Sequence, residues 1–277
     1  MKSGFFISND GSRRFYRGWT LDTPSSGTVV ISHGYAEHGG RYSELASKLN
    51  SAGFDVWIHD YYGHGQSDGK RAEVPNIKLF VKDTELFISE IAVPRDQKKP
   101  LFVYGHSMGG TIALLYAIVH QSSLNGLILS GPVVRPSSQS SAIERAAAHM
   151  LRKIAPSLKY LPFEPEPLCR DPRVVEAYVR DPLVYSGKMK IRMADEFFHA
   201  ERLLRDEALK DLKIPLLLMH GGADEVVPPL NSEVVFSLAS SPDKTRKIFD
   251  GMYHEIHNEP GKEEVFELVC AWLREHV

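Results

Sequence analysis

The stretch from Leu101 to Ala117 constrains the fold of this chain more than any other. It begins with a short apolar run, Leu101–Tyr104, passes through Gly105-His-Ser-Met-Gly109, and continues into Thr111–His120, which is apolar on all sides. The run predicts a buried strand, and the segment after the turn predicts a helix packed on a sheet. The turn has the pattern Gly-x-Ser-x-Gly, in which a strained backbone lifts the serine hydroxyl out of the sheet.

A Gly-x-Ser-x-Gly match alone does not establish a nucleophile. With glycine and serine each at about 7% of residues, a chain of 277 residues contains such a match by chance roughly one time in ten. The predicted strand and helix supply the context in which the pattern has chemical meaning. The role of Ser107 therefore depends on finding a base and an acid at matching positions.

Strands and helices alternate along the first half of the chain. After a predicted hairpin over residues 4–20, the expected strands are Thr28–Ser32, Phe54–Ile58, Leu101–Tyr104 and Gly126–Ser130, and the expected helices are Arg41–Ala52, Ile77–Ile91 and Thr111–His120. This alternation predicts an α/β fold with a mostly parallel central sheet flanked by helices. Ligands bind such sheets beyond the carboxyl ends of the strands, so chemistry is expected there.

The alternation stops after Gly131-Pro132 and resumes at Ile214–Met219. The intervening residues 134–209 are dense in proline and contain no convincing strand, which predicts a helical insertion after the sixth strand. The chain then divides into a first core part (residues 1–133), an inserted cap (residues 134–209) and a second core part (residues 210–277).

An apolar stripe runs along this insertion at three- and four-residue spacing. Its members are Ile143, Ala147, Met150, Leu151 and Ile154, continued beyond Pro156 by Leu158, Leu161 and Phe163. A stripe does not identify its partner: it packs on the core below, or part of it lines an acyl channel or touches lipid. In the second case Met150, Leu151, Ile154 and Leu158 are the candidate substrate contacts.

Composition excludes several classes of protein. The 33 basic and 35 acidic residues give a net charge of −2. The composition therefore lacks the excess of positive charge that is typical of nucleic-acid-binding proteins. Cys169 and Cys270 form no CxxC pair, do not suggest a disulfide framework and are compatible with a reducing cytosol. No apolar run approaches the roughly 18 residues of a membrane span. We expect a soluble cytoplasmic protein that can also contact membranes or lipid droplets peripherally.

The remaining strand ends supply partners for the serine, which needs a base to take its proton and a third group to orient that base. His220-Gly-Gly-Ala-Asp224 follows the strand Leu216–Met219, and Asp224 is the candidate acid. His254 follows the strand Arg246–Phe249 and is the candidate base. The order Ser107, Asp224, His254 is the nucleophile, acid and base order of α/β-hydrolases.

Other residues compete for these roles. His220 and His257 are alternative bases, but His254 lies nearest to its strand end. Asp60 precedes the nucleophile in the chain, and Asp250 lies too close to His254 for the usual arrangement on separate strands.

Two further patterns resemble functional motifs but lack the required spacing. Ser67 follows two glycines in Gly63-His-Gly-Gln-Ser67, which is not the nucleophile pattern. The histidines of His254-Glu-Ile-His257 are three residues apart, whereas a helical zinc protease needs four. We expect no metal and no cofactor.

An oxyanion hole requires donors that are in place before charge develops on the substrate carbonyl. The first expected donor is the backbone N–H of Met108, directly after the nucleophile. The second comes from the loop after the third strand, His33-Gly-Tyr35, where the Tyr35 N–H is the candidate.

The combined motifs resemble the monoacylglycerol lipase (monoglyceride lipase, lysophospholipase-like) branch of the α/β-hydrolases. The resemblance covers nearly the whole core in order and rests on His33–Tyr42, Asp60–Gly69, Gly105–Gly110, His220–Asp224 and Tyr253–Glu259, whereas the cap matches mainly at Asp181–Tyr185. It implies a metal-free Ser-Asp-His esterase with a mobile cap that cleaves monoacylglycerol to glycerol and fatty acid. By matching positions it supports the triad and the two oxyanion donors. Tyr35 departs from the small residue common in the family, which alters room on the glycerol side.

The expected function is therefore hydrolysis of a lipid ester through an acyl-enzyme, with monoacylglycerol as substrate. The same machinery could act on lysophospholipids, on other small or aromatic esters such as hydroxycinnamoyl esters, or as an acyltransferase. A hydrolase-fold binding protein without turnover is another reading of the fold, against which the intact triad argues. Because substrate choice is a property of the cap, fold and triad do not separate these substrates.

Overall fold

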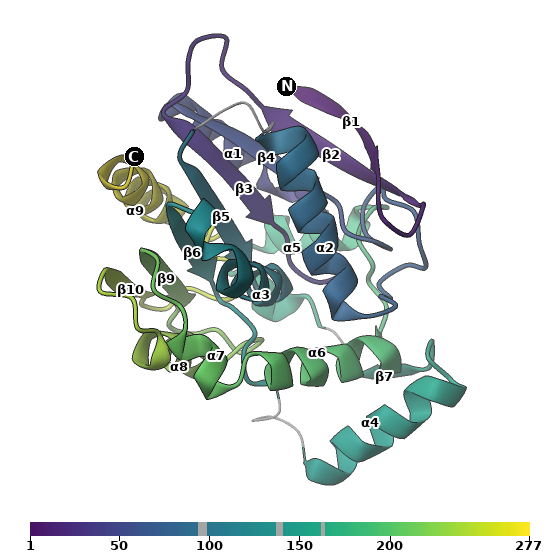
Figure 1. Cartoon of the computed structure of the whole chain (residues 1–277). Coiled ribbons are helices and arrows are strands. Elements are labelled where there is room, and N and C mark those ends of the chain that lie inside the picture. Colours follow the sequence, from purple (N-terminus) through teal and green to yellow (C-terminus); the bar gives the residue numbers. More distant parts are fainter. Residues whose placement is uncertain (94–98, 137–140, 162–163) are drawn as a thin grey trace.

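An eight-stranded sheet forms the centre of the computed structural model, which describes residues 1–93, 99–136, 141–161 and 164–277 (Figure 1). Its strand order is β1-β2-β4-β3-β5-β6-β9-β10. The strands are β1 (Lys2–Ile7), β2 (Arg13–Trp19), β3 (Gly27–Ser32), β4 (Phe54–His59), β5 (Leu101–His106), β6 (Gly126–Ser130), β9 (Leu216–Gly221) and β10 (Lys244–Phe249). The hairpin of β1 and β2 is confirmed, and from β4 to β10 all neighbouring strands pair in parallel, as the sequence predicts.

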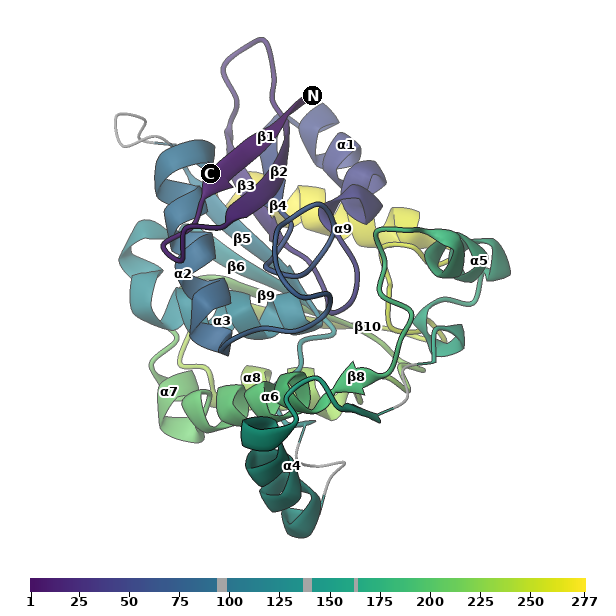
Figure 2. The same ribbon diagram turned by 90° about the vertical axis from the view of Figure 1, so that its right-hand side faces the viewer.

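Helices cover both faces of this sheet (Figures 1 and 2). They are α1 (Ser43–Ser51), α2 (Ile77–Phe87), α3 (Met108–His120), α8 (Leu230–Leu238) and α9 (Lys262–Glu275). Alternate strand residues point to opposite faces. In β3, Val29 and Ile31 pack in the cluster with α1 and α9, whereas Val30 packs in the cluster with α2, α3 and α8. In the described part of the chain, each helix is too short or too polar to span a bilayer.

Several helix boundaries differ from the sequence prediction. The helix expected from Thr111 begins at Met108. The helix expected over Ile77–Ile91 ends at Phe87 and continues as a π-helical turn, Ile88–Ala92. The helix expected from Arg41 begins at Ser43, because a 3₁₀ turn over Gly39–Tyr42 precedes it. Its predicted stop is confirmed: Gly53 has a φ of +102°, a left-handed conformation that favours glycine.

The segment between β6 and β9 contains α4 (Ala142–Ile154), α5 (Pro172–Arg180), α6 (Ile191–Leu203) and α7 (Asp206–Lys210). The expectation that it lacks strands is wrong. A two-stranded antiparallel sheet forms from β7 (Lys159–Leu161) and β8 (Met189–Lys190). Strands of three and two residues are too short for a detectable alternation of apolar and polar positions, and they pair across a long stretch of the segment.

The apolar stripe of α4 does not pack on the core. The exposed fractions are 81% for Ile143, 69% for Met150 and 83% for Ile154. Ala148 is the buried residue of this helix and packs against α6. Figure 1 shows α4 lying outside α6, on the side away from the central sheet. Of the two interpretations of the stripe, packing on the core is therefore wrong; Phe163 lies outside the described residues.

Salt bridges join α4 to α6. Arg152 of α4 pairs with Asp195 and, at 2.8 Å, with Glu196, two carboxylates of α6 that are almost fully buried. Glu196 also accepts the backbone N–H of Ile77 at 2.8 Å. The polar side of α4 thus faces the protein, and this explains why its apolar side faces outward.

The chain after α5 is tied directly to the core. The Tyr185 N–H donates to the Ala36 carbonyl at 2.8 Å, and His38 Nε2 lies 2.9 Å from Asp181 Oδ2. A third contact runs from Arg71 Nη2 to the Leu183 carbonyl at 3.3 Å. Residues 181–185 are therefore fixed to the loops that follow β3 and β4, whereas α4 reaches the core through α6.

A buried ion pair fixes α2 to β2, and its loss should destabilise the fold. Arg14 Nε donates to Asp83 Oδ2 at 2.6 Å, and both side chains are fully buried. Asp83→Ala leaves a buried guanidinium without its main partner, which costs roughly 3–5 kcal/mol in the free energy of unfolding. Urea denaturation measures this loss.

The matched control is Asp68→Ala, which breaks the solvent-exposed pair of the neighbouring Arg13. Exposed pairs contribute little to stability, so this variant should lose much less than Asp83→Ala. Equal losses in the two variants would contradict the role assigned to the buried pair.

Candidate functional site

Ser107 lies at a sharp turn between β5 and α3. Its φ of +54° and ψ of −119° are strained values for a residue with a side chain. A Cβ on Gly109 would lie 1.9 Å from the carbonyl oxygen of Ser32, so α3 approaches β3 too closely for any side chain there. On the other side, the Ser107 N–H donates to the Ser130 carbonyl at 3.0 Å. Both neighbours of β5 therefore hold the turn in place.

The structure brings Asp224 and His254 together in adjacent loops. β9 and β10 are parallel neighbours, and each residue lies beyond the carboxyl end of its strand. His254 Nδ1 lies 2.7 Å from Asp224 Oδ2, and both residues are buried. The other carboxylate oxygen, Oδ1, accepts the backbone N–H groups of Val226 at 3.0 Å and Val227 at 2.8 Å. The carboxylate is thus fixed by its own loop on one side and by the imidazole on the other.

Burial and charge act in opposite directions on the pKa values of this pair. Burial alone lowers the pKa of His254, but the charge and hydrogen bond of Asp224 outweigh it, and the pKa is raised above 6.5. Burial raises the pKa of Asp224, but the interactions with His254 and His220 outweigh it, and the pKa falls well below 3.8. Asp224 is therefore ionised at neutral pH.

The competing residues have structural partners of their own. Asp60 accepts Arg17 Nη1 at 3.1 Å and the backbone N–H groups of Gly39 and Gln66. Ser67 donates to the Asp60 carbonyl and accepts the Phe15 N–H, which makes it a turn residue.

The surroundings of Asp250 and His257 argue against both as members of the triad. Asp250 is exposed. His257 is buried and stacks on Tyr42 with ring centroids 4.8 Å apart. A second histidine, His220, also contacts the Asp224 carboxylate: its Nε2 lies 3.1 Å from Oδ2.

The expected oxyanion donors lie on both sides of Ser107. Met108 is the first residue of α3, where a backbone N–H has no partner within the helix. Tyr35 follows Gly34, whose N–H donates to Glu37 Oε1 at 2.6 Å and fixes the loop after β3. Tyr35 and Ser107 line the same two cavities, so this loop lies beside the serine.

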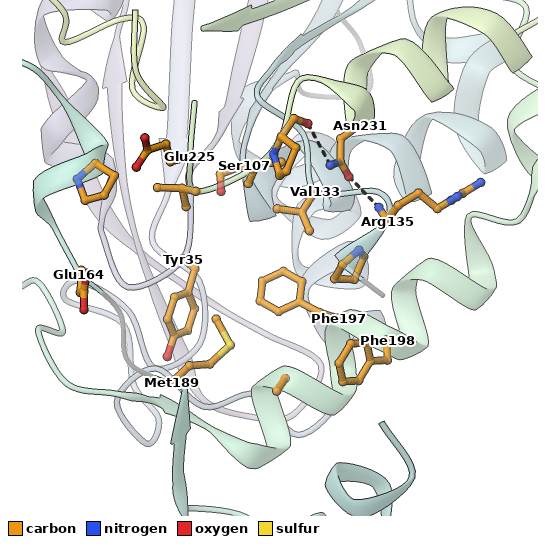
Figure 3. Close-up of a pocket in the computed structure, with 16 residues that line it drawn as sticks. Tyr35, Ser107, Val133, Arg135, Glu164, Met189, Phe197, Phe198, Glu225 and Asn231 are labelled. Carbon is orange, nitrogen blue, oxygen red and sulfur yellow. Dashed lines mark hydrogen bonds between the residues drawn. The ribbon is translucent and has the colours of Figure 1, made fainter. Parts of the chain in front are cut away.

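The larger cavity has a volume of about 420 Å³, and Ser107 is part of its lining. Most of its lining is apolar, with Glu164, Glu225 and Arg135 as charged members. Figure 3 shows the Phe197 side chain between Ser107 and Phe198, with Tyr35 and Met189 beside it. The cavity combines a reactive hydroxyl with an apolar wall, as a site for a molecule with a hydrocarbon part requires.

Among the helices of the insertion, α6 and not α4 contributes to the apolar wall. Met189 and the α6 residues Ala194, Phe197 and Phe198 line the cavity. None of the four predicted contacts, Met150, Leu151, Ile154 and Leu158, does so; all four are exposed. The predicted stripe therefore lies on a helix that does not line the cavity, and on the face of that helix that points away from the protein. A usable signal was the adjacent pair Phe197-Phe198 in a helical stretch of the insertion.

The smaller cavity has a volume of about 20 Å³ and lies between Ser107, His254 and a buried charge cluster. Arg41 donates to Glu255 with both terminal nitrogens, at 2.5 and 2.6 Å, and to Glu37 at 2.6 Å. Sequence reasoning missed this cluster, although Glu37 and Arg41 are four residues apart in a turn and Glu255 follows His254. One guanidinium faces two carboxylates, so the cluster carries excess negative charge when both are ionised.

The strand order, the strained serine turn and the acid and histidine at the next two strand ends define an α/β-hydrolase. Comparison with known proteins narrows this class. A family model described as serine aminopeptidase, S33 matches residues 23–261. The chain belongs to this family and, within the α/β-hydrolases, to its monoacylglycerol lipase branch.

The relatives match nearly the full length of the chain. It is 35% identical to a monoacylglycerol lipase of Mycolicibacterium smegmatis, over 98% of this chain and 96% of that protein. It is 33% identical to human monoglyceride lipase, over 96% of this chain and 88% of that protein. The crystal structure of Paleococcus ferrophilus monoacylglycerol lipase superposes with a TM-score of 0.85 at 32% identity, covering 95% of this chain and 99% of that one.

Proposed function

We propose that this chain hydrolyses the carboxylic ester of monoacylglycerols, with Ser107 as nucleophile, His254 as base and Asp224 as the acid that orients it. The observation that carries the proposal is the Asp224–His254 hydrogen bond together with a strained serine that lines one cavity with His254 and a second, mostly apolar cavity. Membership of the monoacylglycerol lipase branch supports the choice of substrate. In this reading residues 134–209 are the cap that covers the site, with α6 as its substrate-facing part.

The geometry supports one direction of proton transfer. His254 Nδ1 is engaged by Asp224, so in the neutral ring Nδ1 carries the proton and Nε2 accepts one. As the Ser107 oxygen bonds to the ester carbonyl carbon, its proton passes to Nε2. The resulting oxyanion is held by the backbone N–H groups of Met108 and Tyr35.

The intermediate collapses when the bond to the alcohol oxygen breaks and His254 returns the proton to that oxygen. The acyl group stays on Ser107 while glycerol leaves. Water then attacks the acyl-enzyme, His254 takes one of its protons, and the fatty acid departs as the Ser107 hydroxyl is restored.

The charge cluster supports a neutral leaving alcohol. Glu37 accepts hydrogen bonds from the Gly34 N–H, the Tyr42 hydroxyl and Arg41. Burial and the charge of Glu255 raise the pKa of Glu37, and these three donors oppose that rise. Glu255 accepts Arg41 in bidentate fashion, and this outweighs burial and lowers the pKa of Glu255. A lysophospholipid would bring a phosphate close to two carboxylates that share one cation, which is repulsive. Glycerol carries no charge and avoids this repulsion.

A substrate panel on purified protein tests the function. Monoacylglycerol should be turned over in preference to diacylglycerol, lysophospholipid and an aromatic ester. Ser107→Ala should lower kcat by at least about 10⁴-fold, because no other side chain replaces the nucleophile. Ser67→Ala is the control: its hydroxyl bonds only the fold, so the folded variant should keep its activity.

An aminoacyl amide belongs in the same panel because the family description names a peptidase and two carboxylates, Glu164 and Glu225, line the larger cavity. Preference for the amide, or for a phospholipid or aromatic ester, would overturn the substrate assignment. Undiminished turnover by Ser107→Ala would overturn the mechanism itself.

The pH dependence of kcat/KM should report His254. The ring must be neutral to take the serine proton, so activity rises as the pH passes its pKa. Because Asp224 holds this pKa above 6.5, the midpoint of the rise should lie above pH 6.5 in the wild type. In Asp224→Asn the opposing effect of burial remains, and the midpoint should fall while kcat drops. A profile between about pH 5 and pH 9 on a soluble ester measures both; an upward shift in the variant would contradict the assignment.

We also propose that the exposed stripe of α4 makes peripheral contact with membranes or lipid droplets in the cytoplasm. An apolar stripe flanked by basic residues such as Lys153 is suited to the lipid interface. The two unpaired, buried cysteines are compatible with a reducing compartment.

Replacing Ile143, Met150 and Ile154 together by glutamine should weaken binding to phospholipid vesicles in a flotation assay and lower turnover of vesicle-borne substrate. Turnover of a short, water-soluble ester should stay unchanged, because these residues lie outside the cavity. The matched control replaces three residues by glutamine, Ile7, Val119 and Val179, which are also exposed but lie on other elements. Equal losses in both triple variants would argue against a specific role for α4.

A further inference from the structure

A second histidine, His220, lies against the carboxylate of Asp224, the candidate acid. His220 lies in β9, four residues before Asp224, and its side chain is fully buried. Its Nε2 lies 3.1 Å from Asp224 Oδ2 and 2.8 Å from the Val227 carbonyl oxygen. His220 does not line either cavity at Ser107, so it has no contact with substrate.

The surroundings of His220 fix which ring nitrogen carries the proton. Both groups facing Nε2, a carboxylate and a backbone carbonyl, accept hydrogen bonds and cannot donate them. Nδ1 is buried and has no hydrogen-bond partner among the described residues. The neutral ring therefore carries its proton on Nε2, shared between Asp224 and Val227.

This hydrogen bond completes the coordination of the carboxylate. Oδ1 accepts two backbone N–H groups from the loop that follows Asp224. Oδ2 accepts a hydrogen bond from His254 Nδ1 at 2.7 Å and lies 3.1 Å from His220 Nε2, whose N–H is also directed at the Val227 carbonyl at 2.8 Å. His254 itself must move protons during turnover, so His220 is the partner of Oδ2 that takes no part in proton transfer.

We propose that His220 is a positioning residue, whose Nε2–H holds the Asp224 carboxylate in the plane that His254 requires and closes the loop through Val227. This inference rests on the proposed function, since it concerns the acid of that mechanism. His220 acts through Asp224 and does not touch the reacting atoms. A misdirected carboxylate would leave His254 without the partner that sets its tautomer and orientation.

Two amide substitutions separate positioning from packing. The side-chain nitrogen of glutamine can occupy the place of histidine Nε2, whereas that of asparagine corresponds to Nδ1 and falls short of Asp224. His220→Gln should keep kcat within about threefold of the wild type. His220→Asn should lower kcat about ten- to hundredfold, as expected for a lost hydrogen bond to a charged group. KM should change in neither variant.

A spectroscopic readout accompanies the kinetics. The proton between His254 Nδ1 and Asp224 gives a far-downfield proton NMR signal when that hydrogen bond is ordered. The signal should persist in His220→Gln and shift or broaden in His220→Asn. The matched control is His59→Asn, at another buried histidine near the end of β4, which should reduce stability without altering the signal or kcat.

Equal behaviour of the glutamine and asparagine variants, whether both active or both impaired, would overturn the inference, because packing alone would then explain His220. Should neither variant fold, the wild type decides: ¹⁵N NMR of labelled histidine should show the His220 proton on Nε2. A proton on Nδ1 would overturn the inference. The proposed function fails separately, if Ser107→Ala retains turnover.

Discussion

The close approach of α3 to β3 is the constraint on which the rest of the site depends. Gly109 allows the helix backbone to touch the end of β3, and this contact forces the chain to reverse within one residue at Ser107. The same reversal makes Met108 the first residue of a helix, so a backbone donor follows the serine directly. Strain at one residue is offset by packing along a whole helix, which keeps the hydroxyl at the carboxyl edge of the sheet, where Ser107 is buried but lines both cavities.

The core and the polar residues of the site were predictable because each signal is local. A strand, its turn and the functional residue lie within a few positions of one another at Ser107, Asp224 and His254, and parallel strands bring their carboxyl ends to one edge. The structure places Asp224 and His254 in hydrogen-bond contact, as that reasoning requires. The catalytic roles themselves stay predictions until activity is measured.

Other features could not be predicted because they depend on contacts distant in sequence. Arg41 pairs with Glu255, which lies 214 positions away in the sequence. No local sequence pattern predicts that pairing. The prediction of which side of α4 is buried failed for a different reason. Its inward face is defined by a small residue, Ala148, and by Arg152, which pairs with buried acids of α6. An apolar stripe is ordinarily the buried side of a helix, and here tertiary ion pairs reverse that rule.

The insertion is attached to the core in two separate ways. Residues 181–185 are bonded to the loop that carries Tyr35, whereas α4 is held by side chains of α6. Amino-acid substitutions in α4 therefore leave the backbone around Ser107 unchanged, so long as Arg152 and Ala148 are retained. The exposed side chains of α4 can be replaced without altering the chemistry, whereas Asp181 can be replaced only together with His38, its side-chain partner in the loop beneath.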